Sequence, residues 1–438
     1  MKTWKMLLRM VPVITGIIML FAFSFRRAEP VKKRIPFIPP KGCVFRTIMG
    51  EESSGRFYIY KTPGTVQQAV DRGLSWITGA QHANGGWGAG THQRQDVKDP
   101  HAVATDPATT AMVAMALLRS GTTPSSGLYA ENLQKALNYL LKTVETSEPN
   151  SPNITTETGT QIQIKLGSNI DVILTSQFLS NILTHLGRDA ALKERVKKAQ
   201  KICVEKIQRS QQGNGSMAGS GWAGVLQSSF ATNALEAAEA NGTSIDKAAL
   251  AKARAFQKNN YNTKTGNVNT DLGAGIVLYS VTGSVRASAK EARKVEEEVA
   301  KAKRAGKLSQ SATPSAENLR KIGFDEEDAL QYSTAYEVYH SAKIEAQQED
   351  VMSGFGNNGG EEFLSYLQTG ESMIINKDEG WQRWYDNMSG RMLKIQDNDG
   401  RWQGHHCITS PVFCTATALL ILAVSNDVET LIALGGSK

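Results

Sequence analysis

The side chains best suited to metal binding or nucleophilic chemistry gather near the C-terminal end of the chain. They fall within residues 397–414 and comprise Asp397, Asp399, His405, His406, Cys407 and Cys414. Zinc prefers such His and Cys ligands, and Asp399, His405 and His406 are also weak candidates for catalytic groups. The apolar segment 415–423 follows and predicts a helix whose N-terminus would favour a thiolate. A zinc-binding or catalytic site is therefore one interpretation of this segment.

Two structural interpretations of the same cysteines remain open. In an exported protein, Cys407 and Cys414 could form a disulfide that closes a small loop before the helix. In a reducing compartment, Cys414 could be a buried thiol, because free cysteine is among the most buried residue types. No cofactor is predicted from a recognisable motif, so zinc at this cluster is the one cofactor left open.

Other titratable residues lie elsewhere in the chain. Glu337 and His340 are one helical turn apart in an apolar-aromatic segment and are weak candidates to face a central cavity. The acidic segments 96–99 and 325–328 are predicted to be a loop and a helix N-terminus, where acidic groups stabilise the helix dipole. Asp106 precedes a proline and an apolar run, which predicts a helix N-cap.

The elements that would position these residues repeat along the chain. Residues 81–87 and 396–402 share the spacing Gln-x3-Gly-x-Trp, and residues 211–217 keep the Gln and the Gly but have Met in place of Trp. Each motif follows an amphipathic helical segment and precedes a more apolar one. The repeating unit is therefore predicted to be an outer helix, a turn and an inner helix.

About six such hairpins are predicted between residue 55 and the C-terminus. Hairpins of this kind bury their apolar faces only against their neighbours, and a closed ring does so without exposed caps. The predicted fold is an all-α toroid whose inner helices line a central cavity. Two segments differ: residues 160–165 alternate as a short strand would, and residues 285–307 are predicted to be a charged, solvated helical insertion.

The Gln-x3-Gly-x-Trp turns resemble the prenyltransferase/squalene oxidase repeats (QW motifs) of terpenoid cyclases and protein prenyltransferases. The resemblance covers most of residues 55–438 and implies an α/α toroid. It also implies that the glutamine amide bonds to helix ends while the tryptophan packs beside it, so that adjacent hairpins are tied together. The residues with this structural role would be Gln81, Gly85, Trp87, Gln396, Gly400 and Trp402.

The catalytic motifs of these families are missing from the sequence. It contains no Asp-x-Asp-Asp of proton-initiated cyclases, no Asp-Asp-x-x-Asp of diphosphate-ionising cyclases and no Asp-x-Cys of zinc prenyltransferases. Whether the protein is an enzyme therefore stays open. The missing motifs favour a diverged toroid that serves as a binding or scaffold module. The alternatives are an isoprenoid cyclase or prenyltransferase-like enzyme with its ligand in the central cavity, and a carbohydrate-active lyase or hydrolase.

The net charge of +7 originates in the N-terminal segment. Residues 1–34 hold eight Lys or Arg and one Glu, so the remainder holds 41 basic and 41 acidic residues. A neutral body argues against a nucleic-acid partner. Basic residues surround the apolar run 11–25, which predicts that residues 1–25 are a signal peptide or a signal anchor that takes the protein to the cell envelope or its membrane. Residues 26–54 are predicted to be a basic, proline-rich linker.

Overall fold

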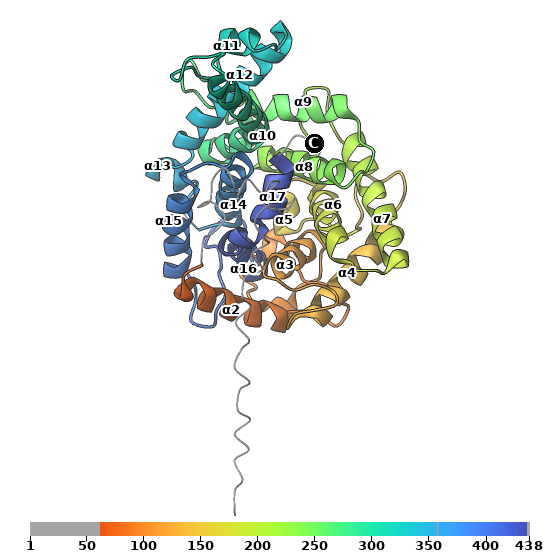
Figure 1. Ribbon diagram of the computed structural model, residues 1–438. Coiled ribbons are helices and arrows are strands. Elements are labelled where there is room, and N and C mark those ends of the chain that lie inside the picture. Colours follow the sequence, from red (N-terminus) through yellow and green to blue (C-terminus); the bar gives the residue numbers. More distant parts are fainter. Residues whose placement is uncertain (1–61, 357, 436–438) are drawn as a thin grey trace, which may run out of the picture. The chain divides into compact units, whose positions relative to one another are not determined.

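The computed structural model describes residues 62–356 and 358–435 of the 438-residue chain. The predicted signal segment 1–25 and the linker 26–54 lie outside the described residues. The described part is helical, and within it the only β structure consists of isolated bridges. Its helices form concentric layers, with one set of helices around another (Figure 1).

The inner layer is a closed ring of helices. Each inner helix packs against the next in chain order, and the last returns to pack against the first. In that order they are α3 (Pro107–Arg119), α6 (Ile170–Ile182), α8 (Gly224–Ala240), α10 (Val277–Arg304), α14 (Gly360–Asn376) and α16 (Pro411–Leu422). This closure confirms the predicted all-α toroid.

The outer layer supplies one helix for each inner helix. Its members are α2 (Gly64–Gly79), α4 (Ala130–Glu145), α7 (Ala190–Arg209), α9 (Lys247–Lys258), α12 (Glu326–Glu345) and α15 (Trp381–Lys394). Outer helices bury one face only, as in α4, where the buried residues recur every three or four positions from Leu133 to Val144. Every residue of the inner helix α16 is buried, because neighbours, the outer layer and the ring axis surround it.

Shorter elements connect the hairpins or cover the ring. One of them, α17 (Val428–Gly435), follows the 3₁₀ turn η5 (Val424–Asp427) and packs against α14, α10 and α8 at one end of the ring axis. The others are η1 (His92–Arg94), η2 (Pro100–Ala102), α5 (Gln161–Lys165), η3 (Leu183–His185), η4 (Asp271–Gly273), α11 (Ala316–Lys321) and α13 (Glu349–Met352).

The strand predicted for residues 160–165 is wrong, because this segment forms the short helix α5. Thr160 and Gln163 make a capping box, in which the Thr160 hydroxyl accepts from the Gln163 N–H at 3.1 Å. The apolar–polar alternation is misleading here because its polar members, Gln161, Gln163 and Lys165, are buried as well. Alternation predicts a strand only when one of the two faces meets solvent.

The helix predicted for residues 285–307 is confirmed as far as Arg304, but the prediction that it is solvated is wrong. Residues 285–304 continue the inner helix α10 without a break, and Val285 and Val295 are fully buried. Beyond the ring, α10 packs with α11 and α12 around a second small core that includes Val295, Val299 and Leu319. Short alanines let α10 and α12 approach closely, so the segment buries itself without the large apolar residues that would have marked it in the sequence.

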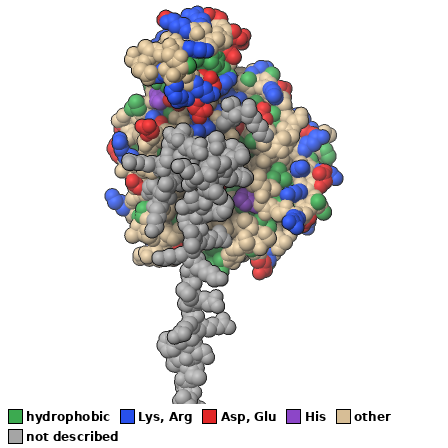
Figure 2. All heavy atoms as spheres, in the orientation of Figure 1, with side chains coloured by type: hydrophobic (Ala, Val, Ile, Leu, Met, Phe, Trp, Pro, Cys, Tyr) green, Lys and Arg blue, Asp and Glu red, His purple; other side chains and the backbone are tan. Residues whose placement is uncertain are grey.

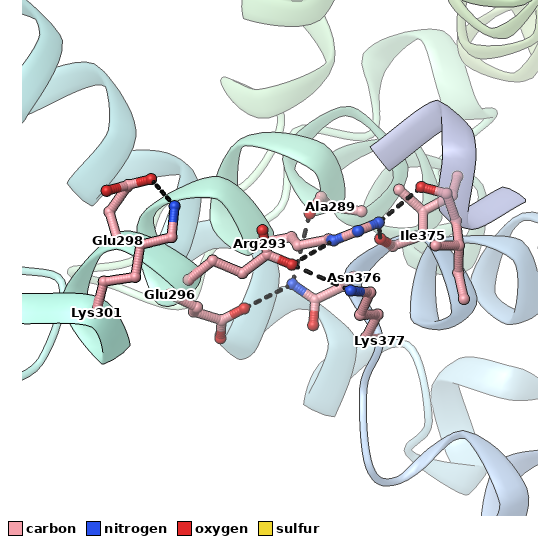
Figure 3. A network of polar contacts seen from close by, with 10 residues as sticks. Ala289, Arg293, Glu296, Glu298, Lys301, Ile375, Asn376 and Lys377 are labelled. Atoms are coloured by element: carbon pink, nitrogen blue, oxygen red, sulfur yellow. Dashed lines mark hydrogen bonds and ion pairs between the residues drawn. The ribbon is translucent and has the colours of Figure 1, made fainter. Parts of the chain in front are cut away.

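Arg293 of α10 ties three helices together (Figure 3). Its side chain is buried, and its Nη1 donates to the carbonyl oxygens of Ile375 in α14 at 3.2 Å and of Ile432 in α17 at 2.7 Å. Its Nε pairs with Glu297 at 3.0 Å. Both carbonyls lie near helix C-termini, where backbone acceptors need partners from outside the helix.

Replacing Arg293 with alanine is expected to lower the free energy of unfolding by about 3 kcal/mol, because it leaves two buried carbonyl oxygens without their donor. Urea denaturation followed by circular dichroism measures the change. The matched control is Lys301→Ala on the same helix, whose pair with Glu298 is 61% exposed on the lysine side. The control is expected to cost less than about 0.5 kcal/mol. Equal losses in the two variants would contradict the assigned role of Arg293.

Candidate functional site

Three turns of the Gln-x3-Gly-x-Trp type, the middle one with Met in place of Trp, join the outer helices α2, α7 and α15 to the inner helices that follow them. In the last turn, Gln396 Nε2 donates to the carbonyl oxygen of Ala69 in α2 at 2.9 Å. In the first turn, Gln81 Nε2 donates to the carbonyl oxygen of Asn132 in α4, also at 2.9 Å. Gln211 bonds to α9 in the same way. Each glutamine thus links its turn to the next outer helix, and Gln396 joins the end of the ring to its beginning.

The tryptophans of these turns are fully buried. Trp402 Nε1 donates to the carbonyl oxygen of Met392 at 2.8 Å, and its backbone N–H donates to the Thr415 hydroxyl of α16 at 2.9 Å. Trp87 makes the equivalent bonds to α2 and to Thr110 of α3. These side chains bind the hairpins to one another, so ligand chemistry has to come from other residues.

The ring axis is closed by charged side chains at the end where α17 lies. Arg119 is buried there, and it donates to Asp427 Oδ2 at 2.6 Å and to Glu371 Oε1 at 2.7 Å. Burial alone would lower the pKa of Arg119, but the two carboxylates outweigh it and raise that pKa above its ordinary value. The cavity beside this group, lined by residues that include Asn181 and Asn233, has a volume of about 40 Å³. It holds little more than one water molecule, whereas ligand pockets typically measure roughly 300–1,000 Å³.

Polar side chains also cross the interior of the ring at two further levels. Ser229 of α8 donates to Gln368 Oε1 of α14 at 2.5 Å. At the opposite end from α17, buried Gln161 donates to the carbonyl oxygen of Ala89 at 2.9 Å and accepts from the Thr409 N–H at 2.7 Å. The central cavity predicted for the inner helices is thus interrupted at three levels by hydrogen-bonded side chains.

Two buried carboxyl groups lie at the N-termini of α3 and α6. Asp106 caps α3, as predicted, and accepts from the N–H groups of Thr109 at 2.7 Å and Ala89 at 2.9 Å. Asp171 accepts from the Ala108 N–H at 3.1 Å and from Gln163 Nε2 at 2.7 Å. Burial raises the pKa of both groups, and for Asp171 the repulsion from Asp106 adds to this effect. Their oxygens are occupied by the protein itself.

A second carboxyl pair, Glu361 and Glu362, lies in the first turn of α14. Both side chains are buried. Glu361 Oε2 accepts from the Ile408 N–H at 3.1 Å, and burial together with repulsion from Glu362 raises the pKa of Glu361 to about 8. Glu362 Oε1 accepts from the Tyr279 hydroxyl at 2.5 Å. The other oxygen of Glu362, Oε2, has no hydrogen-bond partner among the described residues.

His406 is the residue of the C-terminal cluster 397–414 that lies near Glu362 of this carboxyl pair. Its Nε2 is 3.9 Å from Glu362 Oε2, and burial lowers the pKa of the ring. His405, in contrast, is exposed and lies beside His406 with 4.8 Å between ring centroids. Asp399 is exposed on the turn and pairs with Arg401. Of the weak catalytic candidates, only His406 therefore lies at a buried polar site.

Cys407 and Cys414 are free thiols, so the disulfide interpretation does not describe this structure. Cys414 is buried, and its Sγ donates to the carbonyl oxygen of Ile408 at 3.4 Å, which agrees with the buried-thiol interpretation. Cys407 has a left-handed backbone with φ 57° and faces Glu361 and Lys165. Burial raises the pKa of Cys407 to about 12, so its thiol stays protonated near neutral pH.

Within the described ranges, no group of three or more His, Cys, Asp or Glu side chains is placed to hold a metal ion. The zinc interpretation therefore gains no geometric support from the cluster at residues 397–414. Asp397 and Asp399 serve the turn instead, because both pair with Arg401.

The prediction that Glu337 faces a central cavity is wrong. Glu337 is exposed on the outer helix α12, where its Oε2 is 3.5 Å from the Thr263 hydroxyl. His340, one turn later, pairs with Glu296 of α10 at 2.7 Å. The error arises because α12 packs on the extension of α10 rather than on the ring axis, and the sequence of a single helix does not reveal this partner.

Two grooves lie beside the loop that precedes α8. The first measures about 530 Å³ and includes the exposed Trp222, and the second measures about 440 Å³ and includes Asn260 and Ser280. Ser220 lines both, so the grooves adjoin across this loop. Volumes of this size match those of ligand pockets.

Five residues of these sites were not predicted from the sequence: Lys165, Tyr279, Glu361, Glu362 and Asn260. The adjacent glutamates directly before the apolar run of α14 could have indicated a pair of buried carboxyl groups, because the ring buries acidic residues that begin an inner helix. The glycines around Trp222 could have indicated an exposed aromatic side chain, since a glycine-rich loop with one large aromatic residue tends to hold that residue in solvent. Lys165 and Tyr279 carry no such local signal.

Comparisons with known proteins find a similar solved structure and no family. No family model matches the chain, and no curated protein matches it. Among solved structures, the chain is similar to a variant of the type II terpene cyclase MstE from Scytonema in complex with its product, merosterolic acid A. The TM-score is 0.41 at 12% identity, over 83% of this chain and 98% of that one. The α/α-toroid fold of this protein is shown by its own ring of helices and turns.

No single helix in residues 62–356 and 358–435 is long and apolar enough to cross a bilayer. One bent pair, α16 with residues Val424–Gly435 at 58°, meets the requirement by length and composition only. On the described part of the face shown in Figure 2, acidic and basic side chains are interspersed.

Proposed function

We propose that this protein is a catalytically diverged toroid that serves as a binding or scaffold module and does not cyclise isoprenoids. The observation that carries the proposal is the closed ring axis. Arg119, Ser229–Gln368 and Gln161 cross it at three levels, and the cavity beside Arg119 has a volume of about 40 Å³. An isoprenoid that folds into a polycyclic product needs a chamber of several hundred Å³ with an apolar lining.

The buried carboxyl groups support the same proposal. A proton-initiated cyclase must aim a carboxylic acid at its substrate, whereas the oxygens of Asp106 and Asp171 are bonded to backbone N–H groups and to Gln163. These bonds stabilise helix ends and the junction between α3 and α6. Groups used in this way are parts of the scaffold.

The site of action is proposed to be the cell envelope. The support is the basic and apolar N-terminal segment, residues 1–34, whose charge differs from the neutral remainder of the chain. In this proposal the segment exports the toroid or anchors it to the membrane, and the toroid binds a ligand through its loops.

A carbohydrate-active enzyme is the second candidate. The support is the arrangement of three titratable side chains. Glu362 Oε2 has no hydrogen-bond partner among the described residues and lies 3.9 Å from His406 Nε2. The neighbouring Glu361 has a raised pKa, and groups with shifted pKa values are typical of acid–base sites. Cleavage of an oligosaccharide by the full-length protein, lost in Glu362→Gln, would favour this candidate over a non-catalytic module.

Incubating the purified full-length protein with squalene and with allylic diphosphates is expected to yield no cyclised product. Gas chromatography with mass spectrometry detects such products, and a type II terpene cyclase assayed in parallel shows that the conditions support cyclisation. The reason for the expected result is the closed ring axis. Any cyclised product formed above the rate without enzyme would overturn the proposed function.

A further inference from the structure

We propose that the two adjoining grooves beside Trp222 form one binding site for an extended, uncharged oligosaccharide. This inference names the ligand class of the binding module and so rests on the proposed function. It combines three observations: an aromatic ring held outward, a lining of amides and hydroxyls, and buried polar atoms that lack a partner.

Trp222 is held outward on a rigid loop. Its side chain is 63% exposed, whereas its backbone N–H donates to the carbonyl oxygen of Ile164 at 3.3 Å. The neighbouring Gly221 and Ala223 donate to Leu166 and Lys165 at 3.1 and 2.7 Å. A Cβ on Gly221 would lie 2.6 Å from the Ile164 carbonyl oxygen, so the loop packs too closely for a side chain there. An exposed ring on a loop fixed in this way is a preorganised contact surface.

Lys165 supports the ring from the protein side. Its side chain is buried, and its Nζ lies 4.2 Å from the centroid of the Trp222 ring. The cation–π contact fixes the orientation of the indole and leaves much of it in solvent. An aromatic face presented in this way packs against the C–H groups on the flat face of a sugar ring.

The first groove offers hydrogen bonds without a strong charge. Beside Trp222 it is lined by side chains with amide or hydroxyl groups, among them Asn153, Thr158 and Ser168. Such groups both donate and accept, as sugar hydroxyls require. A phosphate-rich ligand would need several cations, and a lipid would need an apolar lining. The lining therefore favours a neutral polyhydroxylated ligand.

The second groove contains polar atoms that await a partner. Asn260 and Ser280 are among the residues that line it, and the buried atoms Asn260 Nδ2 and Ser280 Oγ have no hydrogen-bond partner within the described part of the chain. Asn260 is 7% exposed and Ser280 is 0% exposed. Buried polar groups are normally hydrogen-bonded, so these two atoms point to a ligand or to water that a ligand hydroxyl can replace.

The junction of the grooves sets the shape of the ligand. Ser220 lines both, so one occupant that stacks on Trp222 can continue across the loop towards Asn260. A monosaccharide would fill only one groove. An oligosaccharide would use the aromatic ring at one end and the unpartnered amide and hydroxyl at the other.

The test is a titration of the full-length protein with cello-, chito-, malto- and manno-oligosaccharides, each as a disaccharide and as a hexasaccharide. Calorimetry gives the affinity, and tryptophan fluorescence reports on the ring itself. At least one hexasaccharide is expected to bind more tightly than about 1 mM. Trp222→Ala is expected to weaken its binding at least about tenfold. Asn260→Leu is expected to weaken the binding of the hexasaccharide more than the binding of the disaccharide.

Leu330→Ala is the matched control, because Leu330 is 61% exposed but lies on the outer helix α12. It is expected to leave the affinity unchanged, and both Trp222→Ala and Leu330→Ala are expected to melt within a few degrees of the parent protein. Absence of binding by every hexasaccharide below about 10 mM, or full affinity in Trp222→Ala, would overturn the proposal. A peptide that binds in a Trp222-dependent manner would overturn the sugar assignment alone. A cyclised isoprenoid, or Glu362-dependent cleavage of an oligosaccharide, would overturn the proposed function.

Discussion

Replacing Gly400 with alanine is expected to lower the free energy of unfolding by at least about 3 kcal/mol. Gly400 has φ 97°, a backbone conformation that side chains rarely adopt. A Cβ there would lie 2.7 Å from the carbonyl oxygen of Arg72 in α2, so the outer helix itself would have to move. The variant therefore strains the contact through which the last turn joins the first outer helix. Thermal and urea denaturation measure the loss.

Gly390→Ala is the matched control for this prediction. Gly390 lies inside α15, ten residues before Gly400, and a Cβ there would meet nothing within 4 Å. Alanine is the better helix former, so this variant is expected to gain roughly 0.5–1 kcal/mol. If Gly400→Ala were as stable as the parent protein, the ring-closing role of the last turn would be wrong.

The same geometry recurs at the other two turns. Gly85 and Gly215 have φ 89° and 94°, and a Cβ on either would lie within 2.6 Å of a backbone oxygen of the next outer helix. The glycine of the motif is therefore needed for two reasons: it adopts the positive φ, and its lack of a Cβ allows the neighbouring helix to approach closely.

Stability is expected to fall as the pH rises from 5 to 9, and Glu361→Gln is expected to remove much of this loss. Burial raises the pKa of Glu361 from an ordinary 4.5 to about 8. A carboxyl group with a raised pKa in the folded state keeps its proton there at a pH where the unfolded chain has lost it. Its unfavourable contribution therefore grows from about pH 4.5 upwards and is complete above about pH 8. The full effect is on the order of 5 kcal/mol.

Glutamine removes this titration while keeping the size of the side chain and an oxygen that can accept from the Ile408 N–H. The variant is expected to be more stable than the parent protein at pH 8.5 and close to it at pH 5. Glu317→Gln is the control, because Glu317 is exposed, pairs with Lys321 and has a lowered pKa. Denaturant midpoints across this pH range measure both variants. Parallel curves for the parent protein and Glu361→Gln would contradict the assigned burial of a protonated Glu361.

The elements that could be predicted from the sequence are those with local, repeated patterns of residues. Outer helices show spaced apolar residues because they bury one face, and α16 is apolar throughout because all of its faces are buried. Asp106 was predicted to be an N-cap because a cap acts within four residues of chain. The two failures, at residues 160–165 and 285–307, came where burial depends on neighbours distant in sequence.

The candidate site was harder to predict from the sequence, because it too depends on residues that are distant in the chain. His406 stood out by its type and crowding, but its partner Glu362 comes from α14, and Tyr279, which donates to Glu362, comes from α10. Cys407 and Cys414 are close in sequence, yet one faces Lys165 and the other points at a backbone carbonyl. Spacing along the chain does not reveal such directions.

By itself, the sequence determined that the chain is a ring of helical hairpins, because apolar periodicity and the Gln-x3-Gly-x-Trp turns are properties of consecutive residues. Only the tertiary structure decided that the ring axis is closed, that two glutamates are buried beside His406, and that Trp222 is held outward between two grooves. Each of these depends on side chains from several hairpins meeting at one place, where burial and the available partners set what a group can do.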